Sequence, residues 1–344
     1  MDDVLHTYSI TRGGPLRRAE RAARIVHDDP RDLVRRVAAA SAIGYAPVLA
    51  LGIGWRVVSG TWPVALVELT THVRVLVMLP LLLLGEQLIE LRATAAGSYL
   101  LRSRLVVPEQ AEAHRSIVER TERVRNAGVV EALLLVGAFV SVLALPPFTR
   151  ESAAAIRWSV GPSVLLYRFL MLRILWRWLL WGLYLFRLSR FPLNLRATHP
   201  DQVGGLAPLA GPSIVFGVVV MAAASSAAAS WGDHMRFEGV RAVVFADDVI
   251  AYIVLALAVA AAPLWVFIPR LGRLRKQGVG RYGAFATGYA EAFEQRWFDR
   301  NGGSGAEALG TADIQSLNDL GGSFDRVVHI RPVIAPRADL TPEN

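Results

Sequence analysis

Residues 161–186 read GPSVLLYRFLMLRILWRWLLWGLYLF, an apolar stretch of the chain that also carries Arg168, Arg173 and Arg177. The stretch is long enough to cross a bilayer core about 30 Å thick. An arginine held in the hydrocarbon costs about 3 kcal/mol on insertion scales, so it rarely occurs there without a partner or a function. The stretch therefore predicts an integral membrane protein with a charged interior.

The composition of the whole chain agrees with a membrane protein. Its 344 residues are 53% hydrophobic, and the apolar residues form uninterrupted blocks. Cysteine is absent, which excludes disulfides, thiolate metal sites and cysteine nucleophiles. The net charge of +8 comes almost entirely from arginine, with Lys276 the only lysine. Membrane topology accounts for this charge, so we expect no nucleic-acid partner.

Six membrane spans are predicted from the apolar blocks, at residues 37–55, 73–91, 127–145, 161–186, 208–231 and 249–268. Arginines are dense in both tails and in the loops after spans two and four, and sparse in the alternate loops. The positive-inside rule then places both termini in the cytoplasm. We expect an all-α, polytopic transmembrane helical bundle with cytoplasmic helical extensions.

The predicted bundle divides the chain into four parts. Residues 1–36 form a basic cytoplasmic N-terminal helix, and residues 37–269 form the six-span membrane domain. Residues 270–331 form a cytoplasmic helical region. Residues 332–344 form a disordered tail, because their composition is polar and rich in proline.

Charged residues in three spans are spaced so that they can meet. Arg173 and Arg177 lie four residues apart and share one face of a helix. Glu86 and Glu90 have the same spacing in span two, and Glu131 lies at the start of span three. Their similar depth predicts direct arginine–carboxylate pairs. Two interpretations stay open: an ion-pair cluster that fixes helix packing, or a water-accessible vestibule that attracts anions.

Two further sets of polar residues lie in or near the spans. Span five is built of small residues and contains three serines, Ser225, Ser226 and Ser230. These small residues indicate close helix packing, or alternatively a pore-lining face with hydroxyl groups. At the outer side, Arg74 lies at the start of span two, and Asp247 and Asp248 precede span six. They pair across an outer mouth or lie as solvated loop ends.

The loop between spans four and five contains THPDQVGGL at residues 198–206. His199, Pro200 and Asp201 force a turn, and the paired Gly204 and Gly205 allow unusual backbone angles. One interpretation is a small metal or proton site formed by the histidine and the aspartate. The other is that the aspartate caps the following turn. Two ligands are too few to predict a metal site.

The segment DIQSLNDL, at residues 313–320, predicts a short helix that docks under the membrane domain. Because this segment and the HPD loop are both expected in the cytoplasm, together they are a candidate gate. A folded cap on the cytoplasmic face is the alternative. The residues of this candidate gate are His199, Asp201, Gly204, Gly205, Asp313 and Asp319.

These motifs carry a resemblance to a known group of proteins. The tryptophan-rich fourth span, the THPDxxGGL loop and residues 310–320 (GTADIQSLNDL) resemble an uncharacterised family of bacterial multi-pass inner-membrane proteins. The resemblance implies a location in the bacterial cytoplasmic membrane and a cytoplasmic HPD loop. It implies no activity and no functional residue.

The function predicted from these features is membrane transport, by a channel-like homo-oligomer that passes small ions. Fixed arginine charge near a pore favours anions, and no internal repeat points to a carrier. The alternative is a membrane scaffold or sensor that recruits a partner through its cytoplasmic tails. No HExxH, GxSxG, P-loop or GxGxxG motif is present, so we expect no enzyme, cofactor or metal. The expected partners are the lipid bilayer, further copies of the chain and a small ion or solute.

Overall fold

The computed structural model describes residues 21–22, 31–144, 159–298 and 311–334. Within these residues the regular elements are all helical, as the sequence predicts, and none is a strand. The α-helices are α2 (Asp32–Ser59), α3 (Leu69–Val73), α4 (Leu79–Arg102), α5 (Ala111–Arg125), α6 (Gly128–Ala144), α8 (Gly161–Arg190), α9 (Gly211–Glu238), α10 (Ala246–Ala261), α11 (Ile268–Trp297) and α13 (Ala312–Val328). The predicted N-terminal helix lies largely outside the described residues.

Five helical segments are long and apolar enough to cross a membrane. They are Asp32–Ser59, Leu69–Arg102, Gly161–Arg190, Ala207–Glu238 and Ala242–Trp297. A sixth is counted if Pro108–Arg125 and Gly128–Ala144, which meet at a bend of 42°, form one span. The charged α5 cannot itself lie in hydrocarbon, so α6 supplies the apolar part of the third predicted span.

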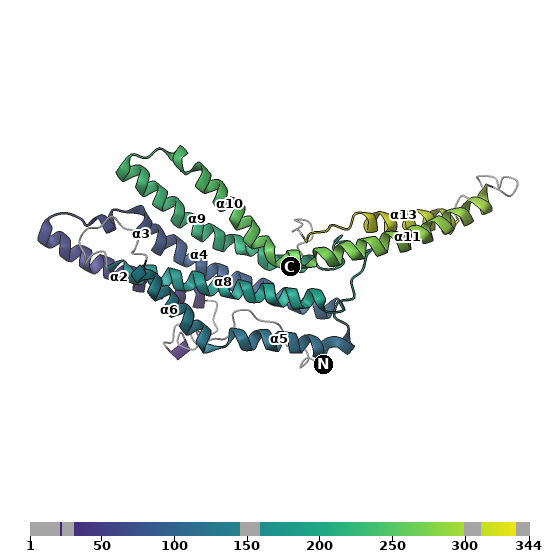
Figure 1. The fold of residues 1–344 in the computed structure, drawn as a ribbon, viewed down its shortest axis with the longest axis horizontal. Coiled ribbons are helices and arrows are strands. Elements are labelled where there is room, and N and C mark those ends of the chain that lie inside the picture. Colours follow the sequence, from purple (N-terminus) through teal and green to yellow (C-terminus); the bar gives the residue numbers. More distant parts are fainter. Residues whose placement is uncertain (1–20, 23–30, 145–158, 299–310, 335–344) are drawn as a thin grey trace.

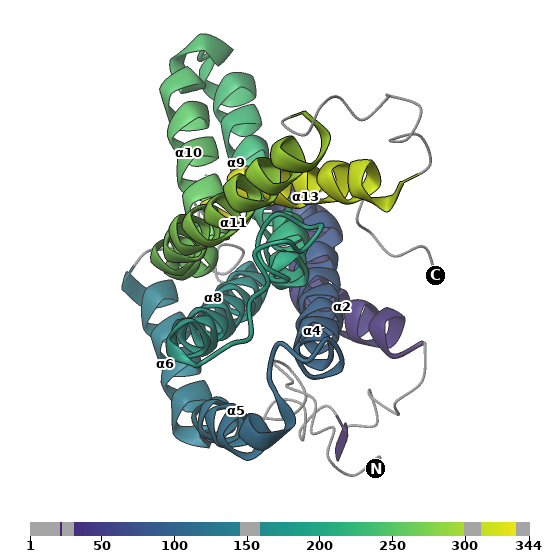
Figure 2. The same ribbon diagram turned by 90° about the vertical axis from the view of Figure 1, so that its right-hand side faces the viewer.

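The bundle is organised around α4 and α8. Figures 1 and 2 show these two helices at its centre, with α2 and α6 beside them and α10 on the outer side of α9. The core contains Trp181, Tyr184, Leu79, Leu82 and Leu100, all fully buried. The end of the bundle where α4 and α8 finish and α9 begins carries the HPD loop. We call it the HPD side, and it is the side predicted to be cytoplasmic.

Helices α4 and α9 pack at close range. At Gly85 of α4, an added Cβ would lie 2.8 Å from Cγ2 of Val219 on α9. Val219 and Ala222 of α9 are buried. Small residues let two helix backbones approach, which gains dispersion contacts that larger side chains would prevent. The small-residue character of span five is thus used in packing against α4.

Tryptophans of α8 tie the centre of the bundle to α9 and to the end of α10. The indole of Trp178 stacks on Phe216 of α9, with ring centroids 4.3 Å apart. Its Nε1 donates to the carbonyl of Val259 at 3.0 Å. Trp181 packs beside Tyr184, with ring centroids 5.4 Å apart. These deep tryptophans therefore pack between helices, since each buried ring contributes both apolar area and a defined contact geometry.

Helices α11 and α13 lie side by side and extend away from the membrane bundle (Figure 1). The 30 residues of α11 make it about 45 Å long. Both helices lie largely within the helical region predicted at residues 270–331. We call α11 and α13 together the arm. At its base, an added Cβ on Gly278 would lie 2.7 Å from Cγ1 of Val327, so the two helices are in close contact there.

Residues 329–334 continue from the arm back to the bundle, and we call them the strap. Ile330 and Ile334 of the strap are buried, and Ile334 belongs to the main core. The tail predicted to be disordered from residue 332 thus begins with packed residues. Residues 335–344 lie outside the described residues.

Replacing Gly85 by alanine tests the α4–α9 contact. The added methyl group has no room against Val219, so we expect Gly85→Ala to lower the free energy of unfolding by about 1–3 kcal/mol. Gly217 on α9 is the matched control, because a Cβ added there would meet nothing within 4 Å. Gly217→Ala should leave stability unchanged or raise it by up to about 1 kcal/mol. Unfolding of both variants in mixed micelles measures the difference, and equal values would contradict the close contact.

Candidate functional site

The candidate site is a network of buried charges between α2, α4, α6 and α8. Its centre is Glu86 of α4, whose two carboxylate oxygens accept from three arginines. Oε1 accepts from Nη1 of Arg173 at 2.5 Å and from Nη1 of Arg177, both on α8. Oε2 accepts from Nη2 of Arg36 on α2 at 2.9 Å. One carboxylate therefore joins three helices.

A second carboxylate, Glu131 of α6, completes the network. Its Oε1 lies 3.3 Å from Nε of Arg173 and 3.9 Å from Nη2 of Arg177. The two arginines predicted to share a face thus reach both Glu86 and Glu131. Glu90 lies one turn from Glu86, and its Oε1 is 3.5 Å from the hydroxyl of Thr94.

The side chains of this network are shielded from solvent. The four residues of α4, α6 and α8 (Glu86, Glu131, Arg173 and Arg177) are between 2% and 8% exposed. Removing a charge from water is costly, and in a low-dielectric interior the cost is met only when partners and hydrogen bonds are close. The network therefore fixes the relative positions of four helices and holds its own charges away from water.

Arg36 is the member of the network that the sequence did not predict. It is one of eight arginines before residue 37, and nothing in its local pattern separates it from the others. Arg36 lies in the second turn of α2, and it contacts α4 only because the two helices pack together. The contact is separated by 50 residues along the chain.

Two more arginines lie beyond the network, near the start of α8. Arg168 donates from Nη1 to the carbonyl of Ser141 on α6 at 2.5 Å, and its Nε lies 3.3 Å from Oη of Tyr167. The guanidinium of Arg74 lies over the ring of Tyr167, 5.3 Å from its centroid. Tyr167 therefore contacts both arginines, by a hydrogen bond and by a cation–π interaction.

Arg74 is the most unusual of the buried charges. It is 2% exposed, and its Nε and Nη1 have no hydrogen-bond partner within the described part of the chain. It also begins a π-helical turn, Arg74–Met78, and such turns often occur at functional sites. Asp247 and Asp248 are exposed at the start of α10 while Arg74 is buried, which agrees with the interpretation of the two aspartates as solvated loop ends.

Arg177, Arg173, Arg168 and Arg74 lie at successive depths, and we call them the arginine column. Nine residues separate Arg177 from Arg168 along α8, which corresponds to about 14 Å. Arg74 continues the series beside Tyr167. The four residues place fixed positive charges at successive levels along α8, with Arg168 on a different face of the helix from Arg173 and Arg177.

Asp233 of α9 makes another long-range contact that the sequence did not reveal. Its carboxylate accepts from the backbone N–H groups of Leu69 and Thr70 at 2.8 and 2.9 Å, and from the Thr70 hydroxyl at 2.6 Å. It therefore caps the N-terminus of α3 from a different helix. This cap holds the short helix that leads into the π-helical turn of Arg74.

The serines of span five lie on α9, which packs mainly between α4, α3 and α10. Ser225, Ser226 and Ser230 are half-buried. The hydroxyl of Ser225 donates to the carbonyl of Ala222 within its own helix at 2.8 Å. Their placement matches close helix packing, and the pore-lining role remains a prediction.

In the HPD loop, Asp201 organises the backbone. Its Oδ1 accepts from the N–H groups of Val203 and Gly205 at 2.9 and 3.0 Å, and its Oδ2 accepts from that of Ala207 at 3.1 Å. Nδ1 of His199 lies 2.8 Å from the same Oδ1. The aspartate thus holds the turn that leads into α9, as the capping interpretation predicts.

The backbone of the HPD loop uses left-handed conformations at its glycines. Gly204 and Gly205 have φ angles of +71° and +99°, a region that other residues rarely adopt. Gln202 also has a positive φ, at +58°. The paired glycines are therefore required by the turn that Asp201 caps.

The residues of the predicted gate lie in two separate places. Asp313 of α13 pairs with Arg296 near the far end of α11 at 3.1 Å, and Asp319 bonds Gln315 within its own helix. Arg296 is 18 residues from Gly278 at the arm's base, or about 27 Å along α11. Asp313 and Asp319 thus belong to the arm and do not reach the HPD loop.

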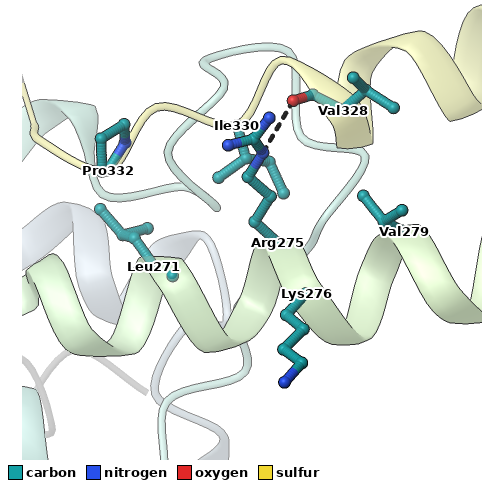
Figure 3. Close-up of a pocket in the computed structure, with 8 residues that line it drawn as sticks. Leu271, Arg275, Lys276, Val279, Val328, Ile330 and Pro332 are labelled. Atoms are coloured by element: carbon teal, nitrogen blue, oxygen red, sulfur yellow. Dashed lines mark hydrogen bonds between the residues drawn. The ribbon is translucent and has the colours of Figure 1, made fainter.

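The strap is the C-terminal segment that contacts the HPD loop. Arg331 donates its backbone N–H to the carbonyl of Gln202 at 2.9 Å and its Nη2 to the carbonyl of Asp201 at 3.1 Å. Figure 3 shows the cleft between the strap and α11, where Nε of Arg275 donates to the carbonyl of Val328 at 2.9 Å. The cleft is lined mainly by apolar side chains, so it does not resemble an ion site.

No protein-family model, curated protein or solved structure matches the chain. Within the described residues, no group of three or more histidines and carboxylates is placed to hold a metal ion. The likeness to bacterial inner-membrane proteins with a THPDxxGGL loop therefore stays a prediction. The geometry of the charged groups is the main guide to function.

Removing the charge of Glu86 tests the network. In Glu86→Gln three arginines lose their shared carboxylate, so we expect the free energy of unfolding to fall by about 3 kcal/mol. Glu119→Gln is the control, because the pair of Glu119 with Arg115 is about half exposed and should contribute less than about 1 kcal/mol. Unfolding in mixed micelles measures both variants. A loss in Glu86→Gln as small as that of the control would show that the network does not hold the helices together.

Replacing Asp201 tests the capping of the HPD loop. Asp201→Ala leaves three backbone N–H groups without their acceptor, so the loop should open and stability should fall by about 3 kcal/mol. Hydrogen exchange of residues 199–207 should become at least tenfold faster. Asp319→Ala is the control on the arm and should leave this exchange unchanged. Unaltered exchange in Asp201→Ala would contradict the role of the carboxylate.

Proposed function

We propose that this chain is a membrane transport protein that passes small anions, in the manner of a channel and as a homo-oligomer. The arginine column is the observation that carries the proposal. Arginine keeps its positive charge at any physiological pH, so the column offers permanent attraction to anions. Buried ionisable residues within spans commonly mark ion pathways.

The outer part of the column supports the proposal most directly. Two guanidinium nitrogens of Arg74 lack hydrogen-bond partners within the described residues. A buried donor without a partner costs free energy, so such a group is favoured where a ligand supplies the acceptor. A passing anion supplies that acceptor and leaves the site free again afterwards.

The inner part of the column corresponds to a closed state in this proposal. There Glu86 and Glu131 occupy the guanidinium groups of Arg173 and Arg177. An anion must compete with these carboxylates to pass. Opening therefore requires α2, α4, α6 and α8 to separate enough for water to enter the network, and the proposed gate is this network itself.

The homo-oligomer is proposed from α10. This helix has no buried residue, and Ile250, Val254, Leu255 and Leu257 are more than half exposed. Its main neighbours are α9 and the adjoining 3₁₀ turns, so both lipid and a second protomer have access to it. Contact between protomers here would bury an apolar face and bring several arginine columns into one assembly.

A scaffold or sensor is the second candidate, and the arm is the observation that favours it. The arm extends from the bundle (Figure 1) and carries exposed apolar side chains, Phe285, Phe298 and Ile314. Such side chains suit a protein partner. Ion flux through the purified chain separates the two candidates, because a scaffold needs none.

Flux through liposomes tests the transport proposal. The full chain in liposomes should release chloride and nitrate in preference to potassium. Arg74→Gln should reduce chloride flux by about tenfold, which corresponds to about 1.4 kcal/mol, because it removes one fixed charge of the column. Arg56→Gln is the control, since Arg56 lies exposed beside Trp62 outside the column. Circular dichroism checks that each variant is folded, and Arg168→Gln provides a second test of the column.

The same measurements define what would contradict the proposal. Absence of flux for chloride, nitrate and phosphate in the wild-type chain would favour the scaffold. Equal flux in Arg74→Gln, Arg168→Gln and the control would exclude the arginine column as the pathway. If Glu86→Gln changes the flux by more than the loss of folded protein accounts for, the network is part of the pathway.

A further inference from the structure

A cavity of about 390 Å³ lies on the HPD side, between the end of α4 and the HPD loop. It is separate from the arginine column and from the charge network. One wall comes from the end of α4 and the connection to α5, and the other comes from the segment that follows α8. The polar residues that line it are Tyr99, Ser103, Arg104, Glu109, Asn194, Arg196 and His199.

The two walls of this cavity are fixed to each other. The backbone N–H of Asn194 donates to the carbonyl of Leu105 at 2.9 Å, which joins the segment after α8 to the end of α4. Leu105 is buried. On the loop side, Nδ1 of His199 is held by Asp201 at 2.8 Å. The cavity is therefore bounded by residues in a defined geometry.

Arg104 has a backbone conformation that is unfavourable for arginine. Its φ is +54°, in the left-handed region, where glycine and asparagine are the ordinary residues. An arginine there costs free energy relative to glycine, and such costs concentrate at functional positions. A glycine at this position would avoid the backbone cost, but it would not provide a guanidinium group.

The cavity has the charge of an anion site. Arg104 and Arg196 are exposed, and within the described residues neither forms an ion pair or a side-chain hydrogen bond. Glu109 is the one carboxylate that lines the cavity, so the two guanidinium groups outweigh it. Arginine presents donors in a planar fork that matches phosphate oxygens, and serine, asparagine and tyrosine side chains add further donors.

We infer that this cavity binds the phosphate group of a ligand between Arg104 and Arg196. Its volume suits a phosphate with a small attached group. The chemistry is the same for the head group of an anionic phospholipid and for a soluble phosphate compound. The cavity lies where α4 leaves the apolar part of the bundle, so a lipid head group and a soluble compound both have access to it. Basic lipid sites commonly lie at such a place. The inference does not depend on transport, since it uses none of the column's residues.

The test uses the full chain in detergent, with the double variant Arg104→Gln and Arg196→Gln. The control double variant, Arg273→Gln and Arg281→Gln, removes two charges from exposed positions of α11 outside the cavity. In one arm, sodium pyrophosphate is titrated at constant ionic strength and the midpoint of thermal unfolding is followed. In the other, retention of phosphatidylglycerol against phosphatidylcholine is measured by native mass spectrometry.

We expect the wild type and the control to respond to at least one probe, and the double variant to need at least tenfold more of it. Stabilisation by pyrophosphate alone identifies a soluble ligand, and retention of phosphatidylglycerol alone identifies a lipid head group. Either result supports the inference. A wild type that responds to neither probe, or a double variant that matches the control, overturns it. Arg196→Gln alone changes an exposed loop residue and repeats the test if the double variant does not fold.

Discussion

The structure depends on one constraint: a charge buried among apolar helices must have a partner. Glu86 meets that constraint for Arg36, Arg173 and Arg177 together, and it thereby joins α2, α4 and α8 at a single carboxylate. Glu131 adds α6 to the same network. Apolar packing between these helices tolerates small shifts, whereas charge-assisted hydrogen bonds have short ranges and defined directions. The network therefore sets the register of the bundle.

The same constraint acts differently along the arginine column. Carboxylates satisfy Arg173 and Arg177, a backbone carbonyl satisfies part of Arg168, and the ring of Tyr167 faces Arg74. The buried carboxylates of Glu68 and Asp233 attract Arg74 electrostatically, but its Nε and Nη1 have no hydrogen bond within the described residues. An N–H group without a hydrogen-bond partner binds an exchangeable anion more readily than one already bonded to a carboxylate. In the proposed function, the ion-pair cluster would therefore be the closed part of the pathway, and Arg74 the part that accepts an anion.

Local sequence patterns were enough to predict the helices and part of the charge network. The four-residue spacing of Arg173 and Arg177, with carboxylates at similar depth, pointed to Glu86, Glu90 and Glu131, and the structure pairs the arginines with Glu86 and Glu131. The capping role of Asp201 followed from a turn of a few residues. The contacts of Arg36 and Asp233 span 50 and 164 residues, and no periodic pattern marks such a pair. Contacts of this kind arise only from the packing of helices that are distant in the sequence.

The HPD loop is held from two directions. On one side His199 and Arg196 face a cavity shared with the end of α4. On the other, Arg331 of the strap bonds the backbone of Asp201 and Gln202. The arm's base also meets the loop, because a Cβ on Gly278 would lie 3.2 Å from that of Ala197. The loop directly connects α8, which carries Arg173 and Arg177, to α9, so its position depends on the positions of both helices. A ligand in the cavity and a partner on the arm would therefore act on the same short segment.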